Sequence, residues 1–172
     1  MKMNNLNLIA SVDLNCGIGK DGNLLFPIKR DMERFRELTT GNIVIMGRKT
    51  LDSLPDGKPL PNRVNIVLTR DKTFKRDSVI VCNSLGELSD ALNAHQKKQA
   101  FVIGGGEIYR LLLPYCSTAY ITRVNAAKPA DTHIINLDEN AEWTQVEQSA
   151  EFIENDISFT FRIYKRIQKT AV

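Results

Sequence analysis

Short apolar runs, each ended by a glycine, a proline or a cluster of polar residues, set the pattern of most of the chain. Runs of this length with few polar positions are typical of strands buried on both faces. They predict strands at 6–12, 42–46, 63–69, 78–82, 100–103 and 118–125. Between the strands, helical periodicity predicts helices at 27–40, 84–97 and 106–113. Pro27 suits the first turn of the first helix, and Ser84 with Glu87 forms a capping-box pattern at the second.

Near the C-terminus the pattern changes to alternation, which is typical of antiparallel strands with one buried face. It runs through 144–148 and 158–166, and it places Phe159, Phe161 and Ile163 on one face. Trp143 and Tyr164 are expected to pack in the core or at the edge of this pair. The whole pattern predicts a single domain of the α/β fold class. Its central sheet is expected to be mostly parallel and flanked by helices, with an antiparallel hairpin at the C-terminus. Residues 1–172 are expected to form this one domain.

Composition narrows the classes of function. The chain has 172 residues, 42% of them hydrophobic, and a net charge of +3 without a basic face, so we expect no nucleic-acid partner. No apolar run approaches the length of a membrane span, and the first seven residues lack the apolar core of a signal peptide. Three cysteines without Cys-x-x-Cys spacing indicate reduced thiols in the cytoplasm. Two distant histidines predict no metal site.

The first candidate catalytic residue lies on the helix predicted at 27–40, because the apolar face of this helix contains one acid. Spacings of three and four place five residues on this face: Ile28, Asp31, Met32, Phe35 and Leu38. Desolvation should raise the pKa of Asp31, and an acid with a perturbed pKa that lines a cavity is a catalytic candidate. The alternative is a half-exposed acid in the first helical turn, favoured there by the helix dipole.

Three consecutive glycines, Gly104 to Gly106, separate a predicted buried strand from a predicted helix. Backbone without side chains permits close approach of a ligand, and the N–H groups at a helix start favour phosphate. A second strand ends at Gly47, followed by Arg48, Lys49 and Thr50. This segment differs from a P-loop, since five apolar-rich residues separate its glycines. Its bases could hold phosphate, or they could be incidental charges at a solvated helix start.

Two further arginines follow stiff or apolar segments. Arg63 comes after two prolines and begins a predicted strand, where a guanidinium could meet a carboxylate in bidentate fashion. Arg70 follows the same strand and could meet an additional phosphate. Each position also fits an ordinary surface arginine.

Taken together and in order, these fragments resemble dihydrofolate reductase over residues 8–166. The fragments that carry the resemblance are Leu8-Ile9-Ala10, Gly17-Ile18-Gly19, Asp31 with Phe35, Ile45 to Thr50, Pro59 to Arg63, Ile103 to Tyr109 and Asp131-Thr132. The resemblance implies reduction of 7,8-dihydrofolate to tetrahydrofolate by hydride transfer from NADPH, a step of one-carbon metabolism. It also implies binding of antifolate inhibitors, a monomer, and an adenosine-binding subregion at about 42–96.

The resemblance assigns a substrate site. Asp31 matches the family's acid, which hydrogen-bonds the pterin ring and assists its protonation. The carbonyls of Ile9 and Ile103 match acceptors of the pterin amino group, and Arg63 matches the residue that grips the α-carboxylate of the glutamate tail. The full set of matching substrate residues is Ile9, Asp31, Met32, Phe35, Leu54, Lys58, Arg63, Ile103, Tyr109 and Thr122.

The resemblance also assigns a cofactor site. Ser11, Ile18 and Gly19 match positions beside the nicotinamide, and Thr69 and Arg70 match the site of the adenosine 2′-phosphate, which favours NADPH over NADH. The other matching cofactor residues are Lys20, Arg48, Lys49, Thr50, Asn83, Gly104, Gly105, Gly106, Glu107, Ile108 and Tyr109. A cis peptide bond between Gly104 and Gly105 is expected from the same resemblance.

Two positions depart from the family pattern. The family usually has Trp five residues before the acid and Pro two before it, where this chain has Phe26 and Lys29. Phe26 lacks an indole N–H, so the loop 13–25, which closes over the nicotinamide in the family, is expected to close differently. Altered rate or antifolate sensitivity should follow rather than loss of activity.

Two other functions remain open on the residues alone. An NADPH-dependent pterin or pyrimidine reductase of the same fold would share the glycine turn but would need neither Asp31 nor Arg63. A non-catalytic nucleotide-binding or interaction domain would bind NADPH without turnover. Consumption of NADPH with dihydrofolate distinguishes the three.

Overall fold

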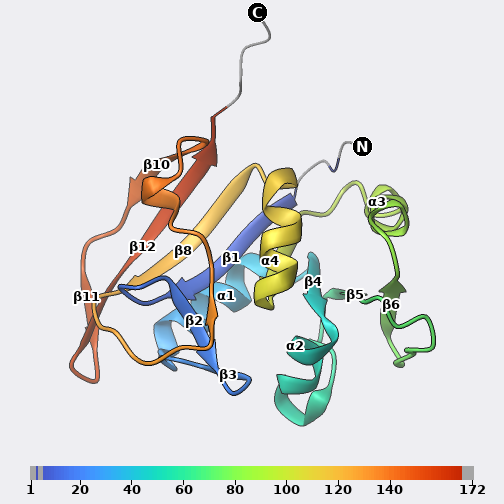
Figure 1. Cartoon of the computed structure of the whole chain (residues 1–172), viewed down its shortest axis with the longest axis horizontal. Helices are drawn as coiled ribbons and strands as arrows, with labels where there is room; N and C mark the ends of the chain where they lie inside the picture. The colour runs from blue at the N-terminus through green and yellow to red at the C-terminus, as the bar shows by residue number, and fades with distance from the viewer. Residues whose placement is uncertain (1–2, 4–5, 168–172) are drawn as a thin grey trace, which may run out of the picture.

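A central sheet of nine strands organises the part of the chain that the structure describes, which is Met3 and residues 6–167 of a computed structural model (Figure 1). The strand order is β10-β12-β8-β1-β7-β4-β5-β6, with β11 paired to β12. The parallel strands are β1 (Leu6–Val12), β4 (Ile43–Gly47), β5 (Val64–Leu68), β6 (Val79–Cys82), β7 (Ala100–Gly104) and β8 (Thr118–Val124). The predicted mostly parallel sheet is confirmed.

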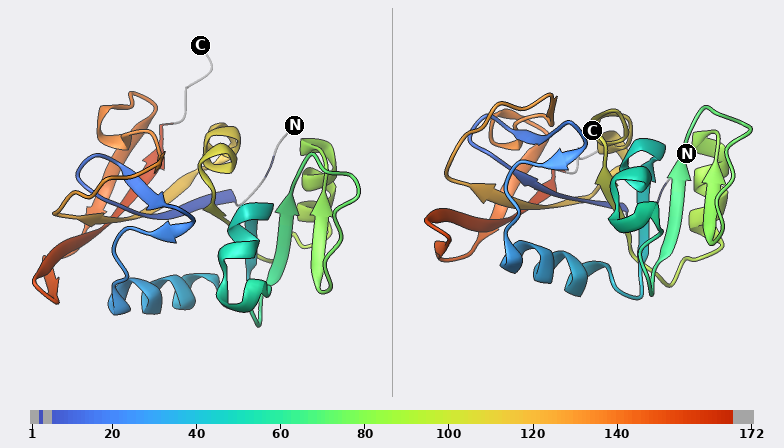
Figure 2. Two further views of the ribbon diagram at one scale, coloured as in Figure 1. Left: turned by 60° about the horizontal axis from the view of Figure 1, so that its bottom comes forward. Right: turned by 90° about the horizontal axis from the view of Figure 1, so that it is seen from below.

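Helices cover both faces of this sheet (Figure 2). They are α1 (Lys29–Thr39), α2 (Arg48–Ser53), α3 (Leu85–Asn93) and α4 (Gly106–Leu112), and 3₁₀ turns cover Pro55–Gly57, Leu113–Tyr115 and Leu137–Glu139. On one face, Leu88 of α3 and Leu112 of α4 pack with alternate strand residues such as Ile45. On the other face, Leu51 of α2 packs with Val44. Burial on both faces explains why the parallel strands read as continuous apolar runs.

The C-terminal strands differ in detail from the predicted hairpin. β12 (Ile157–Arg166) is not an edge strand, because it lies between β8 and β10 (Trp143–Gln148) and pairs antiparallel with both. The hairpin is formed by β12 and the short β11 (Phe152–Glu154), which the sequence reading did not identify. Phe159 and Phe161 share a face as predicted and pack in one aromatic cluster with Phe152.

A second sheet of three strands includes two short strands within the segment 13–25, which the sequence analysis treats as a loop. It consists of β2 (Gly17–Lys20), β3 (Asn23–Leu24) and β9 (Thr132–His133) in the order β3-β2-β9. These strands have two to four residues, and β9 comes from a distant segment, so the sequence carries no periodic signal for them. The pairing joins the segment after β1 to the segment after β8.

Two helix boundaries correct the prediction. α1 begins at Lys29 rather than Pro27, and Ile28 is its N-cap residue without a side-chain cap of its own. The carboxylate of Glu154 accepts hydrogen bonds from the backbone N–H groups of Lys29 (2.6 Å) and Arg30 (3.2 Å), so a distant residue fixes the helix start.

α3 ends at Asn93 and not near Lys97, because the chain continues as turns after Ala94. At its other end, Ser84 Oγ accepts from the Glu87 N–H (3.1 Å), as the capping pattern predicted. The Glu87 carboxylate reaches back to the Asn83 N–H (2.7 Å). Strand β5 begins at Val64, one residue later than predicted.

The three cysteines, Cys16, Cys82 and Cys116, are free and buried, in agreement with the prediction of reduced thiols. Burial raises the pKa of Cys82 to about 11 and that of Cys116 to about 12, which keeps both as thiols at neutral pH. In the described part of the chain, no helix is long and apolar enough to cross a membrane. The predicted lack of a signal peptide, and the ends of the predicted 1–172 domain, fall partly on residues 1–2, 4–5 and 168–172, outside the described residues.

Candidate active site

The candidate site lies where neighbouring parallel strands end at the same edge of the sheet. β4 ends at Gly47 and β7 at Gly104, and these strands are paired, with β1 on the other side of β7. Ser11 stands near the end of β1. Ligands of open α/β sheets bind at such carboxyl ends. The topology therefore brings the predicted acid, the glycine turn and the phosphate-binding segment to one edge.

Asp31 is held in this site by a residue of the sheet. It lies in the first turn of α1, and its Oδ1 accepts a hydrogen bond of 2.5 Å from Oγ1 of Thr122 in β8. Burial raises the pKa of Asp31, while the Thr122 hydrogen bond and the nearby Arg34 oppose that rise. The carboxylate is thus both in a first turn and desolvated, and the predicted direction of its pKa shift is confirmed.

Tyr109 closes the site from the opposite face of the sheet. Its ring belongs to α4 and is buried, and its hydroxyl donates a 2.8 Å hydrogen bond to the carbonyl oxygen of Ile9. Desolvation raises its pKa strongly, with the charge of Asp31 as the next cause. Tyr109 therefore remains a neutral hydrogen-bond donor at any working pH.

The predicted apolar wall of the site is open to solvent. Met32 is 45% exposed, while Phe35, Leu54 and Ile103 are half-buried. Apart from Ile28, which precedes the helix, the apolar face of α1 is therefore not fully buried in the core. Lys58 is exposed at the end of the 3₁₀ turn Pro55–Gly57 and forms an ion pair with Asp56 (3.4 Å).

Arg63 is held beside the same wall by two acceptors. Its Nε donates to Oγ1 of Thr39 (2.9 Å) and its Nη1 donates to the carbonyl oxygen of Pro61 (2.6 Å). Its guanidinium lies 6.0 Å from the ring centroid of Phe35. The two hydrogen bonds fix the plane of the guanidinium and leave Nη2 without a hydrogen-bond partner among the described residues.

Two helix starts meet beside the glycine turn. A Cβ on Gly47, the N-cap residue of α2, would lie 3.1 Å from Cγ1 of Ile108 in α4, and a Cβ on Gly104 would lie 3.2 Å from Oγ1 of Thr50. Gly104 also has a φ of +145°, which favours glycine. The Gly104–Gly105 peptide bond is cis, as expected. These contacts bring the starts of α2 and α4 close together.

The cations of the predicted cofactor site are exposed. Arg48 forms a 3.2 Å ion pair with Asp71, and the Nδ2 of Asn83 donates to the carbonyl oxygens of Thr69 (2.8 Å) and Asp71 (3.2 Å). Asn83 therefore orders the loop after β5. The remaining predicted cations, Lys20, Lys49 and Arg70, are exposed, as is Glu107 at the start of α4.

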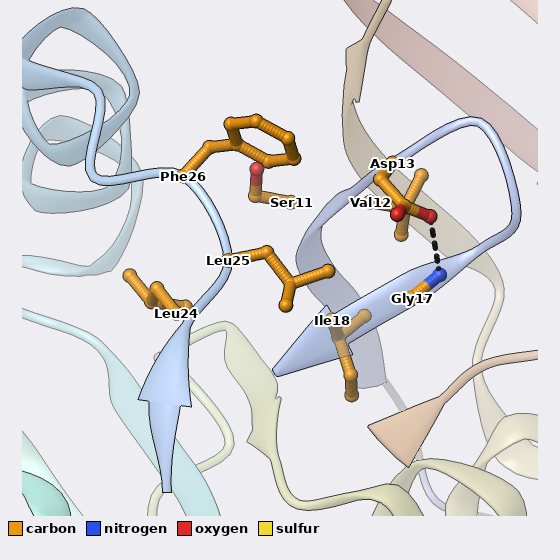
Figure 3. Close-up of a pocket in the computed structure, with 8 residues that line it drawn as sticks. All are labelled: Ser11, Val12, Asp13, Gly17, Ile18, Leu24, Leu25 and Phe26. Atoms are coloured by element: carbon orange, nitrogen blue, oxygen red, sulfur yellow. Dashed lines mark hydrogen bonds between the residues drawn. The ribbon is translucent and has the colours of Figure 1, made fainter. Parts of the chain in front are cut away.

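A small recess adjoins the site between β1 and the segment that follows it (Figure 3). The residues that line it are Ser11, Val12, Asp13, Gly17, Ile18, Leu24, Leu25 and Phe26. Ser11 and Ile18 were predicted site residues. Ser11 and Phe26 are both among the residues that Figure 3 draws around this recess.

Sequence reading missed two residues that order this segment. Asp13 is buried, and its carboxylate accepts from the backbone N–H groups of Asn15, Gly17 and Lys128. Lys128 also donates through Nζ to the Leu25 carbonyl (2.9 Å), and its Nζ lies 4.4 Å from the ring centroid of Phe26. An aspartate shortly before a glycine is a turn signal that could have indicated Asp13, but no signal points to Lys128.

Fold and site together define an α/β enzyme with a desolvated acid beside two glycine-bordered helix starts. The family model for dihydrofolate reductase matches residues 5–166. A dihydrofolate reductase of Bacillus subtilis (strain 168) is 34% identical over 163 residues, 94% of each chain. A bifunctional dihydrofolate reductase-thymidylate synthase of Daucus carota is 35% identical over 95% of this chain and 34% of its own length.

A solved structure of similar fold is dihydrofolate reductase from Enterococcus faecalis, complexed with NADP(H) and RAB-propyl. It has a TM-score of 0.84 and 27% sequence identity, and the match covers 97% of this chain and 99% of that one. The chain therefore belongs to the dihydrofolate reductase family, whose members reduce 7,8-dihydrofolate to tetrahydrofolate with NADPH.

Proposed function

We propose that this chain reduces 7,8-dihydrofolate with NADPH and that Asp31 is the catalytic residue that assists protonation of the substrate. The observation that carries the assignment is the position of Asp31, a desolvated carboxylate that is hydrogen-bonded to Thr122 and lies on the same helix as the solvent-accessible apolar residues Met32 and Phe35. It is also the family's acid by position.

Asp31 acts through its raised pKa. A carboxyl whose pKa is raised toward the working pH is protonated in a larger fraction of the molecules, although each proton is held more firmly, so a pKa near the working pH gives the best balance for proton delivery. The hydrogen bond from Thr122 fixes Oδ1, while Oδ2 has no hydrogen-bond partner among the described residues and can accept from N–H groups of the pterin ring. Proton delivery to the ring then proceeds from this carboxyl, directly or through one water.

The remaining substrate residues position the ring and its tail. The carbonyl oxygens of Ile9 and Ile103 accept from the pterin amino group, and Tyr109 fixes the first of these carbonyls through its own hydrogen bond. Met32, Phe35 and Leu54 form the apolar walls. The fixed guanidinium of Arg63 binds the α-carboxylate of the glutamate tail through its outward-facing N–H groups.

The residues present fit the phosphates of NADPH. Two helix starts supply N–H donors, and Arg48, Lys49, Thr50, Thr69 and Arg70 add charge and hydroxyl groups around them. NADPH supplies the hydride when it is bound. The chain's own residues orient it, with Ser11, Ile18 and Gly19 beside the nicotinamide and Gly104 to Gly106 beside the pyrophosphate.

We also propose a cytoplasmic monomer that binds antifolate inhibitors at the same site. Three free, buried thiols support a reducing compartment. Residues about 42–96 are proposed as the adenosine-binding part of a single 1–172 domain, which is supported by the positions of α2 and Asn83.

A spectrophotometric assay tests the proposed function. The absorbance of NADPH should fall when dihydrofolate is added, and the product should be tetrahydrofolate. Turnover with a pyrimidine or another pterin but not with dihydrofolate would contradict the proposal in favour of another reductase. Binding of NADPH without any turnover would instead indicate a non-catalytic nucleotide-binding domain.

A further inference from the structure

Arg34 is the half-buried cation of α1, one turn after Asp31. Its guanidinium lies 4.5 Å from the ring centroid of Phe161 and 5.7 Å from that of Tyr120. By contrast, Lys29, Arg30 and Arg36 on the same helix are exposed. An arginine that stacks on aromatic rings is held in a fixed plane by cation–π attraction. Phe161 and Tyr120 therefore fix the position of this positive charge.

Strand register places Arg34 and Asp31 over adjacent residues. Phe161 in β12 pairs directly with Thr122 in β8. Residues directly opposite in an antiparallel pair have their side chains on the same face. The ring under Arg34 therefore neighbours the hydroxyl that hydrogen-bonds Asp31, and one pair of strands fixes both ends of the arrangement.

The two charges are near but not in contact. No nitrogen of Arg34 lies within 4.0 Å of a carboxylate oxygen of Asp31. Burial is the main influence on each group, raising the pKa of Asp31 and lowering that of Arg34. The attraction between them opposes both shifts. The carboxylate thus stays free to meet a substrate while a fixed cation offsets part of its desolvation.

We propose that Arg34 is a positioning residue for the reduction of dihydrofolate, a cation fixed on the rings of Phe161 and Tyr120 whose charge stabilises the ionised form of the Asp31 carboxyl. This inference rests on the proposed role of Asp31. Desolvation alone would hold the proton on Asp31 too firmly for ready transfer. Arg34 limits that effect and so sets the pH range over which the carboxyl can give up its proton.

Other charged and titratable groups face this pair from the elements around it. Tyr109 of α4 interacts with Asp31, and Tyr120 of β8 and Glu147 of β10 interact with Arg34. Glu154 of β11 binds the N–H groups at the start of α1. Of these, Glu147 is exposed and the raised pKa of Tyr109 keeps that hydroxyl neutral at pH 7. Arg34 is the cation that acts on Asp31 among the described residues.

The test is a titration of the Asp31 carboxyl by carbon-13 NMR in the NADP⁺-bound protein, with the Asp31→Asn variant identifying the resonance. Arg34→Gln should raise the titration midpoint on the order of one pH unit. Arg34→Lys, which keeps the charge but loses the planar stacking, should raise it by less than half as much. Arg34→Met provides a second uncharged side chain that packs well on aromatic rings if the glutamine variant does not fold.

The matched control is Arg30→Gln. Arg30 lies next to Asp31 in sequence and also covers a ring, since its guanidinium is 4.4 Å from the Phe152 centroid. Its removal should leave the Asp31 midpoint unchanged. An unchanged midpoint in Arg34→Gln, or an equal rise in Arg30→Gln, would overturn the proposal.

Single-turnover rates separate this inference from the proposed function. In Arg34→Gln, the pH at which the hydride-transfer rate falls to half its acid value should rise together with the NMR midpoint. If the carboxyl titration moves and the rate profile does not, Arg34 controls Asp31 but Asp31 is not the proton-delivering group. That result would contradict the proposed function, whereas an unmoved titration contradicts only the role of Arg34.

Discussion

The proposed substrate half and the proposed cofactor half of the site are built in different ways. On the substrate side, Asp31, Thr122 and Tyr109 are buried or half-buried and already hydrogen-bonded, with Arg63 fixed by two acceptors. On the cofactor side, the cations are exposed, and of the predicted set in the described residues only Arg48 is in a short ion pair, with Asp71.

This difference predicts different sensitivities. Buried groups interact in a low effective dielectric, so removing one leaves its partner desolvated and unpaired, and the result depends on pH. Exposed cations act through a screened field that reaches about 8–10 Å at ordinary ionic strength, so their effect depends on salt. The substrate half should respond steeply to single substitutions, and the cofactor half gradually.

Asp31→Asn gives the largest expected effect and the strongest test of the comparison. It should slow hydride transfer by about 10²–10⁴-fold at neutral pH, because proton delivery is lost while the Thr122 hydrogen bond is kept. The measurement is the single-turnover decay of NADPH absorbance with dihydrofolate. Affinity for NADPH, from fluorescence quenching, should stay unchanged. An equal loss of NADPH affinity would mean that Asp31 is structural.

The same variant should be more stable than the wild type at neutral pH. The pKa of Asp31 is raised in the folded state, so its contribution is favourable below the unfolded value of 3.8 and is lost as pH rises through the folded value. The ionised carboxylate therefore opposes folding at pH 7, and Asn removes that cost. Urea unfolding at pH 7 and at acid pH should show that the difference in free energy of unfolding between the two proteins becomes smaller as the pH falls. A difference that does not depend on pH would contradict this link between the pKa of Asp31 and stability.

Arg63→Leu should have the next largest effect, confined to substrate binding. A charge-assisted pair contributes about 1.5–3 kcal/mol, so KM for dihydrofolate should rise roughly 10–100-fold with kcat little changed. A dihydropterin without the glutamate tail is the control, since the variant and the wild type should then be alike. Equal loss with both substrates would remove Arg63 from the tail site.

Arg70→Gln should have the smallest effect and should depend on salt. It should weaken NADPH binding by roughly tenfold, about 1.4 kcal/mol, at low ionic strength and leave NADH binding unchanged. The dissociation constants of the two proteins should converge at high salt, because Arg70 is exposed. If the weaker NADPH binding of the variant persisted at high salt, Arg70 would act in an enclosed site, and the cofactor half would not differ from the substrate half in this respect.

Local patterns predicted most of the large elements. The parallel strands matched their apolar runs, and the Ser84 cap formed as its sequence indicated, because both depend on neighbouring residues. The errors lay where distant residues decide. The start of α1 depends on Glu154, and the β2-β3-β9 sheet depends on a pairing with Thr132 and His133. Neither contact leaves a periodic signal.

The candidate site divides in the same way. The amphipathic pattern of α1 was enough to single out Asp31, and the glycine runs were enough to predict phosphate at helix starts, since helix geometry and glycine's backbone freedom are local properties. Lys128 emerged only with the fold, because its partners Asp13 and Leu25 are 115 and 103 positions away. Asp13 also has the local partners Asn15 and Gly17, and only its bond to Lys128 depends on a distant segment.

By itself, then, the sequence determined the strands, the acid on its apolar face and the glycine-bordered helix starts. Only the tertiary structure decided what surrounds that acid. Thr122 reaches it from β8, and Arg34 is held near it by Phe161, the direct partner of Thr122 in β12. The physical reason is that a charge's environment is set by packing between strands and helices that are distant in the chain, and such packing follows no local period.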